Sequence, residues 1–342
     1  MRKRSTLKEL AQSLDLSVAT VSRALGGYED IAAKTRERVN VKAREIGYVP
    51  NSAGRMLVSG KSGFVGLVVP AHGAAFLDSF LGQFVLGLGE GLASHGCDLF
   101  MSIASEGQSE IDVIAKLVDS GRADRFELTR ITEDDERVRY LQSRHVPFVT
   151  HGRLAGDESS YSWLDTDGAT AFAEAFERLY ALGHRRFGLV TISEPMNAKR
   201  DREAGLLAAM AAKADPSVSL QRVEHARDDF VNLRGDIANL LQSAERPTAI
   251  LGLFDELALI VMHEATRLGI KIPEQLSVIG FDNLASAGLA SPGLSTFDQD
   301  VKGSAKSLGR MIHQLMETPN AALNQLTKAK FVPRGSHGRV DG

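Results

Sequence analysis

The chain has 342 residues, 43% of them hydrophobic, and a formal net charge of −3 at pH 7. This composition is typical of a soluble globular protein with a buried core, and the length exceeds that of one typical domain. The modest net charge argues against a protein that coats nucleic acid without specificity. A single cysteine, Cys97, excludes an internal disulfide and argues against redox chemistry and a structural zinc site, so we expect a small core residue there.

The charge is unevenly distributed along the chain. The first 62 residues hold 12 Lys or Arg against 6 Asp or Glu, a net charge of +6, so the remaining 280 residues carry −9. A basic N-terminal segment on an acidic body favours docking onto a nucleic acid in one orientation.

The first predicted helix begins after Thr6, because Thr6 and Glu9 have the spacing of a capping box. Its apolar side chains share one face: Leu7, Leu10, Ala11 and Leu14. After a turn through Asp15, Ser17 is placed to cap a second helix over residues 18–25.

The second helix has an apolar side and a polar side. The apolar spacing is kept by Val18, Val21 and Leu25. The outward-facing side chains are small, polar or cationic, as a DNA major groove requires: Ala19, Thr20, Ser22 and Arg23. A third helix over residues 33–46 buries Val39, Ala43 and Ile46 and is followed by the stop signals Gly47 and Pro50. The three helices predict a helix-turn-helix module; the alternative is a small helical bundle with a solvated basic face.

These residues closely resemble the DNA-binding head of the lactose and galactose repressor family. The matching runs begin with Thr6-Leu-Lys-Glu-Leu-Ala11 and continue with residues 18–25, 35–39 and 45–51. Residues 51–57 resemble the hinge helix of that family, and Leu57 matches the leucine that is inserted into the minor groove. Two residues depart from the pattern: Asp15 stands where a turn glycine is common, and Gly54 stands where alanine is common in the hinge.

The resemblance and the outward face of the second helix together predict a DNA-binding surface. Val18, Ala19 and Arg23 are expected to contact base edges, with Arg23 donating to guanine. Thr6 belongs to the same predicted surface. The expected contacts to phosphates or sugars are Ser17, Ser22, Thr35, Tyr48 and Asn51.

The body of the chain alternates short apolar runs with helical patterns, which predicts an α/β fold with parallel sheets covered by helices. Candidate strands are residues 64–69, 98–103, 147–150, 187–191, 249–254 and 277–281. Helical patterns fall between them, such as residues 170–182 and 256–268. Because one such unit spans roughly 150 residues, the length predicts two lobes.

The body also resembles the effector domain of the same family, which is similar to periplasmic sugar-binding proteins. The landmarks are residues 66–70, 182–186, 202–205, 247–250, 272–274 and 277–283. The resemblance implies a helix-turn-helix domain at 1–50, a hinge helix at 51–61 and an effector domain at 62–342, with an N-lobe of about 63–164 plus 292–326 and a C-lobe of about 165–291 plus 327–340. It further implies a homodimer or a tetramer that binds a near-palindromic operator in double-stranded DNA.

Ligands of parallel sheets lie beyond the carboxyl ends of the strands, so polar residues that follow strands are candidates. Asp282 matches the acidic residue that accepts hydrogen bonds from sugar hydroxyls or a base in this family; the alternative is a turn or capping aspartate. Arg202 matches the arginine of an Arg-x-x-Gly motif, with a salt-bridged surface arginine as the alternative. Asp255 is a weaker candidate, and Phe254 either stacks on a sugar face or packs in the core.

The strand at residues 147–150 ends in His151-Gly-Arg153, which resembles a subgroup of these regulators linked to glucosides or related sugars. The resemblance implies that His151 and Arg153 face the cleft, although single histidines at strand ends are often structural. Trp163 lies near a predicted lobe crossover and is either a core residue or a platform for a sugar.

Arg125 and Glu127 interrupt what should be a buried strand, where the family commonly has Val-Asp-Gly and apolar residues. Buried charges are costly unless they are paired. Two explanations stay open. Either the strand lies near an edge with both charges solvated, or Arg125 and Arg130 reach into the cleft.

Several function classes are disfavoured. The sequence has no nucleophile elbow, P-loop, His-Glu-x-x-His pair or dinucleotide-binding glycine motif, so we expect neither an enzyme nor a cofactor or metal. A sugar-transport protein should have a secretory signal, whereas this chain begins Met-Arg-Lys-Arg before a helix cap, so we expect a cytoplasmic protein with no membrane partner. We expect a transcriptional regulator, most simply a repressor of carbohydrate-utilisation genes, that responds to a mono- or disaccharide. A non-sugar effector such as a purine is the alternative.

Overall fold

The computed structural model describes residues 5–26, 28, 30–48, 62–70, 79–156, 160–318 and 322–339. The chain divides into two compact units, Met1–Gly63 and Phe64–Gly342. The predicted hinge helix, and with it Asn51, Gly54 and Leu57, lies outside the described residues.

The first unit is a module of three helices, α1 (Leu7–Leu14), α2 (Val18–Leu25) and α3 (Ala33–Glu45). The predicted capping box is present: the Glu9 N–H donates to Thr6 Oγ1 at 3.2 Å, and the Thr6 N–H donates to Glu9 Oε2 at 2.8 Å. Asp15 ends α1 in the left-handed region with φ 53°, a conformation that a short polar side chain tolerates.

The core of the first unit lies between the three helices and consists of Leu10, Ala11, Val21, Ala24, Val39 and Ala43. The prediction that Val18 belongs to the apolar side of α2 is wrong, because Val18 is 44% exposed and Ala24 is buried instead. Val21 and Ala24 are three residues apart and share the buried face of the helix. Val18 is the first residue of the helix, and its side chain lies at the solvent-exposed end of that face.

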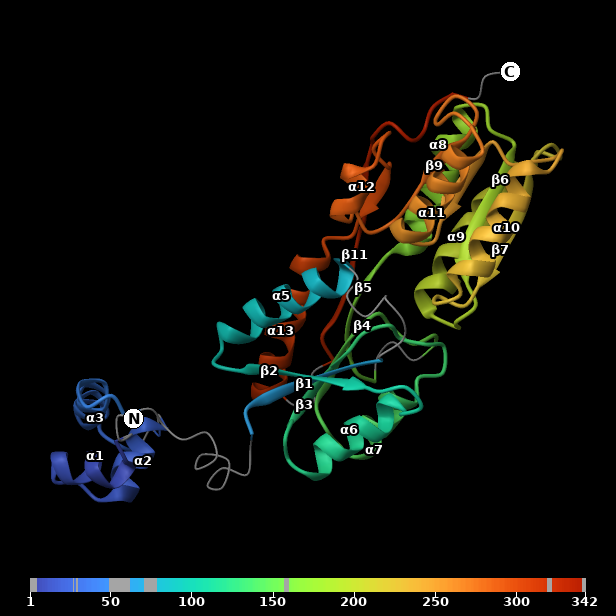
Figure 1. Cartoon of the computed structure of the whole chain (residues 1–342). Coiled ribbons are helices and arrows are strands. Elements are labelled where there is room, and N and C mark those ends of the chain that lie inside the picture. The colour runs from blue at the N-terminus through green and yellow to red at the C-terminus, as the bar shows by residue number, and fades with distance from the viewer. Residues whose placement is uncertain are drawn as a thin grey trace. The chain divides into compact units, whose positions relative to one another are not determined.

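The second unit contains two parallel sheets with helices on both faces (Figure 1), so the predicted fold class is confirmed. The strands of the first sheet are, in spatial order, β2 (Asp98–Ala104), β1 (Phe64–Pro70), β3 (Arg125–Leu128), β4 (Phe148–His151), β5 (Ser162–Thr166) and β11 (Asn324–Thr327). One face packs against α5 (Ser79–Ala93) and α13 (Val301–Glu317), and the other against α6 (Glu110–Asp119) and α7 (Glu136–Ser143). We call this part the N-lobe.

The C-lobe is built on the second sheet. Its strands are, in spatial order, β7 (Ser219–His225), β6 (Arg186–Ile192), β8 (Ala249–Gly252) and β9 (Ser277–Ile279). Its helices are α8 (Gly168–Ala181), α9 (Asn197–Lys213), α10 (Phe230–Gln242), α11 (Asp255–Arg267) and α12 (Ala285–Leu289). A short antiparallel pair, β10 (Thr296–Asp298) and β12 (Lys330–Val332), completes it. The chain passes between the lobes after β5, before α13 and after β11.

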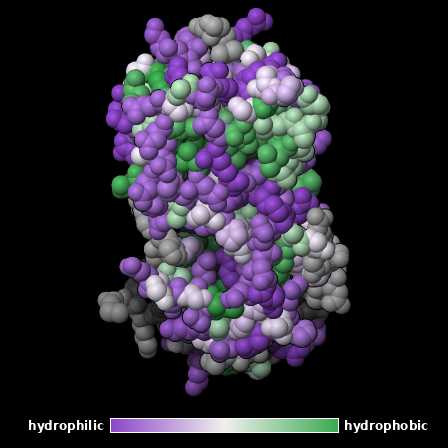
Figure 2. Space-filling view, turned by 90° about the vertical axis from the view of Figure 1, so that its right-hand side faces the viewer, coloured by the Kyte–Doolittle hydropathy of each residue, from purple (hydrophilic) through white to green (hydrophobic). Residues whose placement is uncertain are grey.

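All six candidate strands are present, whereas β5, β7, β10, β11 and β12 were not predicted. The longest of these is β7. Its sequence mixes polar and apolar residues because it lies at an edge of its sheet and buries Val223 alone. On the face drawn in Figure 2, hydrophobic residues gather on the C-lobe, above a largely hydrophilic N-lobe. Within the described part of the chain, no helix combines the length and the apolar character needed to cross a membrane.

Helices α5 and α13 approach each other through glycines. A Cβ atom at Gly87 would collide with the carbonyl oxygen of Lys302, and one at Gly91 with that of Lys306. Gly309 in turn lies against the backbone of Gly91. The backbones of the two helices are therefore in direct contact.

The strand with the unexpected charges is not at an edge. β3 lies between β1 and β4, and Arg125 and Glu127 are both buried, so the prediction of a solvated edge strand is wrong. Arg125 points toward the α5 side of the sheet and donates from Nη1 to Cys97 Sγ at 3.5 Å. Cys97 is buried, as predicted.

Glu127 is the more costly of the two charges. It is fully buried, and neither carboxyl oxygen has a hydrogen-bond partner among the described residues. Burial raises the pKa of Glu127 to about 8, against smaller lowering effects of the Arg137 charge and the His151 backbone. Glu127 is therefore largely protonated at neutral pH, which avoids an unpaired charge in the core.

Replacement of Glu127 by Gln is expected to change the pH dependence of stability. A carboxyl whose pKa rises from 4.5 in the unfolded chain to about 8 in the folded protein contributes stability that is complete below pH 4.5 and is lost as the pH rises toward 8. Glu127→Gln removes this loss, so its melting temperature should exceed that of the parent at about pH 9, with the difference shrinking toward about pH 5. Thermal unfolding followed by circular dichroism measures both, with the exposed Glu106→Gln as control. A difference that is the same at every pH would contradict the assignment.

Candidate functional site

The first unit presents the N-terminal part of α2 to solvent. Ser17 caps the helix by accepting the Thr20 N–H at 3.0 Å, and Val18 and Ala19 beside it are exposed. Ser22, Thr35 and Tyr48 are half-buried, and Tyr48 packs against the core of the unit. The hydroxyl of Thr6 is engaged in the capping box.

Arg23 extends from the same face of α2, and its side chain is 51% exposed. Its guanidinium forms an ion pair with Asp30 and lies over the ring of Tyr28, 5.5 Å from the ring centroid. Both partners are at the surface, where an ion pair contributes little to stability. Arg23 is therefore held in place yet remains available to another acceptor.

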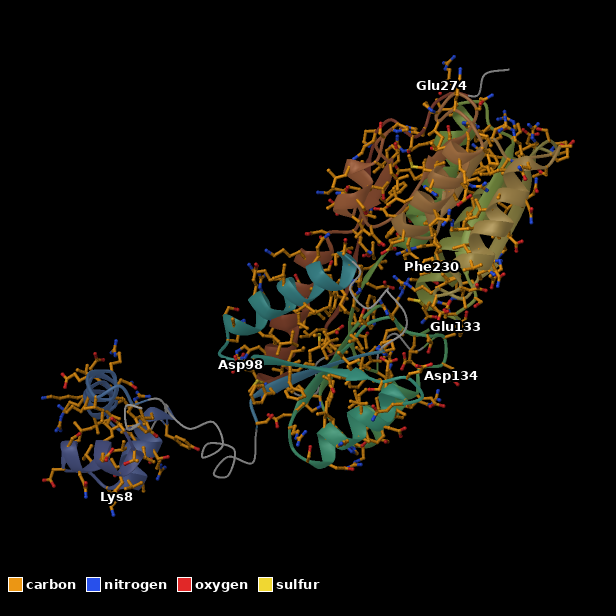
Figure 3. All side chains as sticks on the ribbon, viewed as in Figure 1. Lys8, Asp98, Glu133, Asp134, Phe230 and Glu274 are labelled. Atoms are coloured by element: carbon orange, nitrogen blue, oxygen red, sulfur yellow. The ribbon has the colours of Figure 1, made fainter. Side chains whose placement is uncertain are left out.

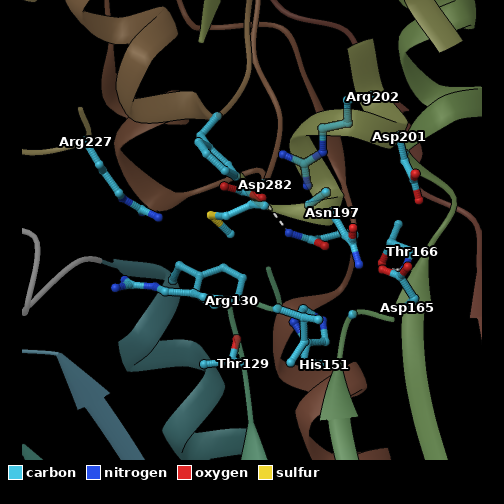
Figure 4. Close-up of a pocket in the computed structure, with 18 residues that line it drawn as sticks. Thr129, Arg130, His151, Asp165, Thr166, Asn197, Asp201, Arg202, Arg227 and Asp282 are labelled. Atoms are coloured by element: carbon cyan, nitrogen blue, oxygen red, sulfur yellow. Dashed lines mark hydrogen bonds between the residues drawn. The ribbon is translucent and has the colours of Figure 1, made fainter. Parts of the chain in front are cut away.

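The second unit contains a cavity of about 700 Å³, counting the open space at its mouth. Residues from both lobes line it (Figure 4), and most lie at or after the carboxyl ends of β3, β4 and β5 in the N-lobe or of β6, β7, β8 and β9 in the C-lobe. The polar lining residues are Thr129, Arg130, His151, Asp165, Thr166, Asn197, Asp201, Arg202, Arg227, Asp282 and Gln299. The cavity thus lies where ligands of parallel sheets are expected.

Arg202 and Asp282 form the C-lobe wall of the cavity. The Arg202 guanidinium lies over Phe281 at 3.7 Å and Phe254 at 4.9 Å from the ring centroids, and its Nη1 donates to the Leu253 carbonyl at 2.7 Å. Burial raises the pKa of Asp282 well above its ordinary value, although the charge of Arg202 opposes this. Asp282 Oδ1 accepts from Gln299 Nε2 at 2.5 Å.

His151 forms part of the N-lobe wall. Its ring packs against Phe84 and Phe80, with centroids 5.2 and 5.8 Å away. Burial, and then the charge of Arg202, lower the pKa of His151 to about 4, so the imidazole is neutral at physiological pH. A neutral imidazole offers one donor and one acceptor.

Four buried polar atoms of the cavity have no hydrogen-bond partner among the described residues. They are Thr129 Oγ1, His151 Nε2, Asn197 Oδ1 and Arg202 Nε. An unpartnered buried polar atom costs roughly 1 to 3 kcal/mol. A polar ligand or water that supplies the missing bonds would recover this free energy.

Asp165 and Asp201 also line the cavity, and both pair with Arg153. Arg153 Nε lies 3.2 Å from Asp165 Oδ2, and Arg153 Nη2 lies 3.6 Å from Asp201 Oδ2. Burial raises the pKa of Asp165 to about 6, against the hydrogen bond from the Thr166 N–H and the charge of Arg153. Asp165 therefore changes charge just below neutral pH.

The structure places five of the predicted effector residues in the cavity lining and three outside it. The five are Asp282, Arg202, His151, Phe254 and Arg130. The other three are Asp255, Arg153 and Trp163. Asp255 is fully buried and accepts from Thr296 Oγ1 at 2.5 Å and from the Leu284 N–H at 2.8 Å. Trp163 is a core residue of the N-lobe with Arg153 over its ring. Of the two arginines proposed to reach the cleft, Arg130 lines it and Arg125 does not.

Several residues that line the cavity were not predicted from the sequence. Thr129 follows β3, whose two charged residues made that strand hard to recognise in the sequence. Asn197 and Asp201 lie in the first turns of α9. Gln299 lies in a chain crossover, which has no sequence signature of its own. A rule that takes residues after every strand would have found Thr129.

The arrangement can bind a polar molecule but shows no reactive constellation. The lining includes both donors and acceptors, and the rings of Phe80 and Phe254 add apolar surface. Across the described ranges, no group of three or more His, Cys, Asp or Glu side chains could hold a metal ion.

Comparisons with known proteins agree with this division of the chain. Residues 6–51 match the model of bacterial regulatory proteins, lacI family, and residues 176–337 match a periplasmic binding protein-like domain. The HTH-type transcriptional regulator AglR of Rhizobium meliloti (strain 1021) is 30% identical, in an alignment that covers 97% of this chain and 94% of AglR.

Two solved structures share the fold over nearly the whole chain. The lac repressor dimer bound to operator and the anti-inducer ONPF has a TM-score of 0.81 at 21% identity, covering 98% of this chain and 99% of that one. A complex of the transcriptional regulator CelR with cellobiose has a TM-score of 0.72 at 23% identity, covering 97% and 100%. The whole-length similarity to AglR, together with the matched head and body, shows that the chain is a DNA-binding transcriptional regulator of the lacI family.

Proposed function

We propose that this protein is a sequence-specific regulator, most simply a repressor, of carbohydrate-utilisation genes. It binds a palindromic operator as a homodimer, and a mono- or disaccharide in the cavity sets its affinity for that operator. The observation that carries the ligand part is the set of four unpartnered buried polar atoms that line one cavity between two aromatic rings. Sugars offer alternating hydroxyl donors and acceptors and an apolar ring face, which complement such a lining.

The homodimer is supported by an apolar surface on the N-lobe. Met101 and Ile103 lie on the edge strand β2, on the side of the sheet that α5 covers, and are 45% and 42% exposed. Leu86 on α5 is 63% exposed. Exposed apolar side chains along a sheet edge favour pairing with another chain, and a second copy buries the same surface on both sides.

The decisive experiment combines operator selection with a ligand panel. Full-length protein is used to select duplexes from a random library, and binding to the selected sequence is then measured with and without mono- and disaccharides, with purines as the control. We expect a palindromic motif and a change in its affinity with at least one sugar. Absence of any preferred duplex would refute the regulatory proposal, and a response to purines alone would refute the sugar.

Arg23→Ala is expected to weaken binding to the selected operator by about 1 to 3 kcal/mol and to relax the preference at one position in each half-site. The loss follows because a bidentate donor to a base edge carries sequence information, unlike a phosphate contact. Binding titrations on the operator and on single-base variants measure both effects, with Arg44→Ala at the far end of α3 as control. Equal weakening on all sequences would show that Arg23 contacts only phosphate.

Asp282→Asn is expected to abolish the sugar response while operator affinity in the absence of sugar stays unchanged. The substitution keeps the shape of the side chain but replaces one acceptor oxygen by a donor, so a sugar hydroxyl that donates to it loses its partner. Operator binding with and without sugar measures both quantities. Glu274→Gln, at the far end of the C-lobe (Figure 3), is the matched control. Loss of both functions together would instead indicate misfolding.

Sugar affinity is expected to fall about tenfold from pH 7 to pH 5, because Asp165 loses its negative charge as the pH drops through about 6 and then accepts fewer hydrogen bonds. His151, whose pKa is about 4, stays largely neutral over this range. Isothermal titration at several pH values measures the profile. Asp165→Asn should flatten it; a profile that persists in the variant would assign the titration to another group.

A further inference from the structure

A buried arginine lies behind the N-lobe wall of the cavity. Arg137, near the start of α7, directs its guanidinium away from solvent and uses all three nitrogens as donors. Nε donates to Asp135 Oδ1 at 2.9 Å, Nη2 to Asp135 Oδ2 at 2.7 Å, and Nη1 to Glu110 Oε1 at 2.8 Å. This bidentate geometry on a carboxylate is specific to the planar guanidinium.

The same guanidinium also grips the backbone of the turn between β3 and α7, residues 129–135. Nη2 donates to the carbonyl oxygens of Thr129 at 3.1 Å and Arg130 at 3.2 Å. Asp135 links it to the turn once more, because Asp135 Oδ2 accepts the Thr132 N–H at 3.2 Å. Arg137 thus bonds directly to two backbone carbonyls of this segment and is linked to a third backbone group, the Thr132 N–H, through the Asp135 side chain.

That segment has an unusual backbone and a defined position in the site. Arg130 adopts φ 57°, a left-handed conformation that costs a residue other than glycine about 1 kcal/mol or more. Thr129 and Arg130 both line the cavity, and the Thr129 hydroxyl is one of its four unpartnered buried polar atoms. The strained residue is therefore a cavity residue, held by Arg137 at its carbonyl.

The turn also joins the two lobes. The Asn197 N–H donates to the Ile131 carbonyl at 3.1 Å, and the Glu133 N–H donates to the Pro195 carbonyl at 2.9 Å. These bonds flank an antiparallel bridge between Thr132 and Met196. A change in the turn would therefore alter the contact between the lobes as well as the cavity wall.

Electrostatics favours the same arrangement. Burial would lower the pKa of Arg137, but its hydrogen bonds to Asp135 and the charge of Glu110 raise it above the ordinary value. Burial likewise opposes ionisation of Asp135, yet the bonds and charge of Arg137 hold the pKa of that carboxyl below its usual range. The charges are therefore retained in the folded protein, where charge-assisted hydrogen bonds are strong.

We propose that Arg137 is a positioning residue of the cavity: its guanidinium holds the turn 129–135 in the left-handed shape that presents Thr129 and Arg130 to the effector and bonds the turn to the C-lobe. The part that concerns the effector rests on the function proposed above. The part that concerns the turn does not, and it can be tested without a ligand.

The first test is amide hydrogen exchange on the full-length protein. Arg137→Lys keeps one positive charge beside Asp135 but lacks the planar fork that reaches both carbonyls. We expect the amides of Thr132 and Glu133 to exchange about tenfold faster in this variant, since each loses a hydrogen bond when the turn relaxes. Arg144→Lys makes the same change at the exposed C-terminal end of α7, where Arg144 pairs with Asp119 outside the turn, and should leave exchange unaltered.

A second substitution separates positioning from general stability. Glycine adopts a left-handed conformation without strain, so Arg130→Gly should restore slow exchange at Thr132 and Glu133 in the Arg137→Lys background. Loss of a buried ion pair alone would speed exchange across the N-lobe, α13 included, and Arg130→Gly would not reverse it. That pattern, or unchanged exchange in Arg137→Lys, would overturn the proposal.

The ligand readout uses whichever sugar of the panel binds the parent protein most tightly. Arg137→Lys should weaken that sugar about tenfold, Arg144→Lys should not, and neither should change operator affinity without sugar. A sugar that binds Arg137→Lys as tightly as the parent would overturn the effector part of the proposal. If no sugar binds the parent, the proposed effector is wrong, while the exchange measurement still decides the role of Arg137.

Discussion

Parallel strands fix where polar side chains must go, and this constraint shapes the effector unit. Three strands of the N-lobe sheet and all four strands of the C-lobe sheet end at the cavity, so the polar residues at and after their ends face it. Buried polar groups accumulate there with fewer partners than they need. These unpartnered polar groups cost free energy in the ligand-free protein, and they make the cavity selective for a molecule with complementary hydroxyl groups.

The distribution of charge in the cavity follows from burial as much as from pairing. Arg202 keeps a charge in the interior because two aromatic rings and a backbone carbonyl replace its water shell. His151 and Glu127, on neighbouring strands of the N-lobe, are instead pushed toward their neutral forms. The cavity lining therefore combines the fixed charge of Arg202 with the neutral imidazole of His151, and such a mixture of charged and neutral hydrogen-bonding groups suits a polar ligand.

The sequence predicted the elements with strong local signals and missed those that depend on the tertiary fold. The capping box at Thr6, the turn at Asp15 and the six apolar strands each have a signal in adjacent residues. β3 lacked one, because the partners that make its charges tolerable, Cys97 for Arg125 and a shifted protonation state for Glu127, are properties of the folded protein.

The same distinction holds in the cavity. Asp282 and Arg202 were found through motifs that match a family, whereas Asn197, at the start of α9, and Gln299, in a crossover between the lobes, have no such motif. Asp255 shows the opposite error: a carboxylate directly after a strand is placed like a ligand contact but is used to hold Thr296 and Leu284. Position after a strand therefore does not by itself identify a residue that contacts a ligand.

The glycine contact between α5 and α13 has a mechanical consequence. Interlocked backbones at Gly87, Gly91 and Gly309 leave no room for one helix to slide along the other, so the pair moves as a single rigid body. Gln299, which bonds to Asp282 inside the cavity, lies two residues before the first turn of α13. A displacement of that glutamine that moves α13 therefore moves α5 as well, together with the exposed Leu86.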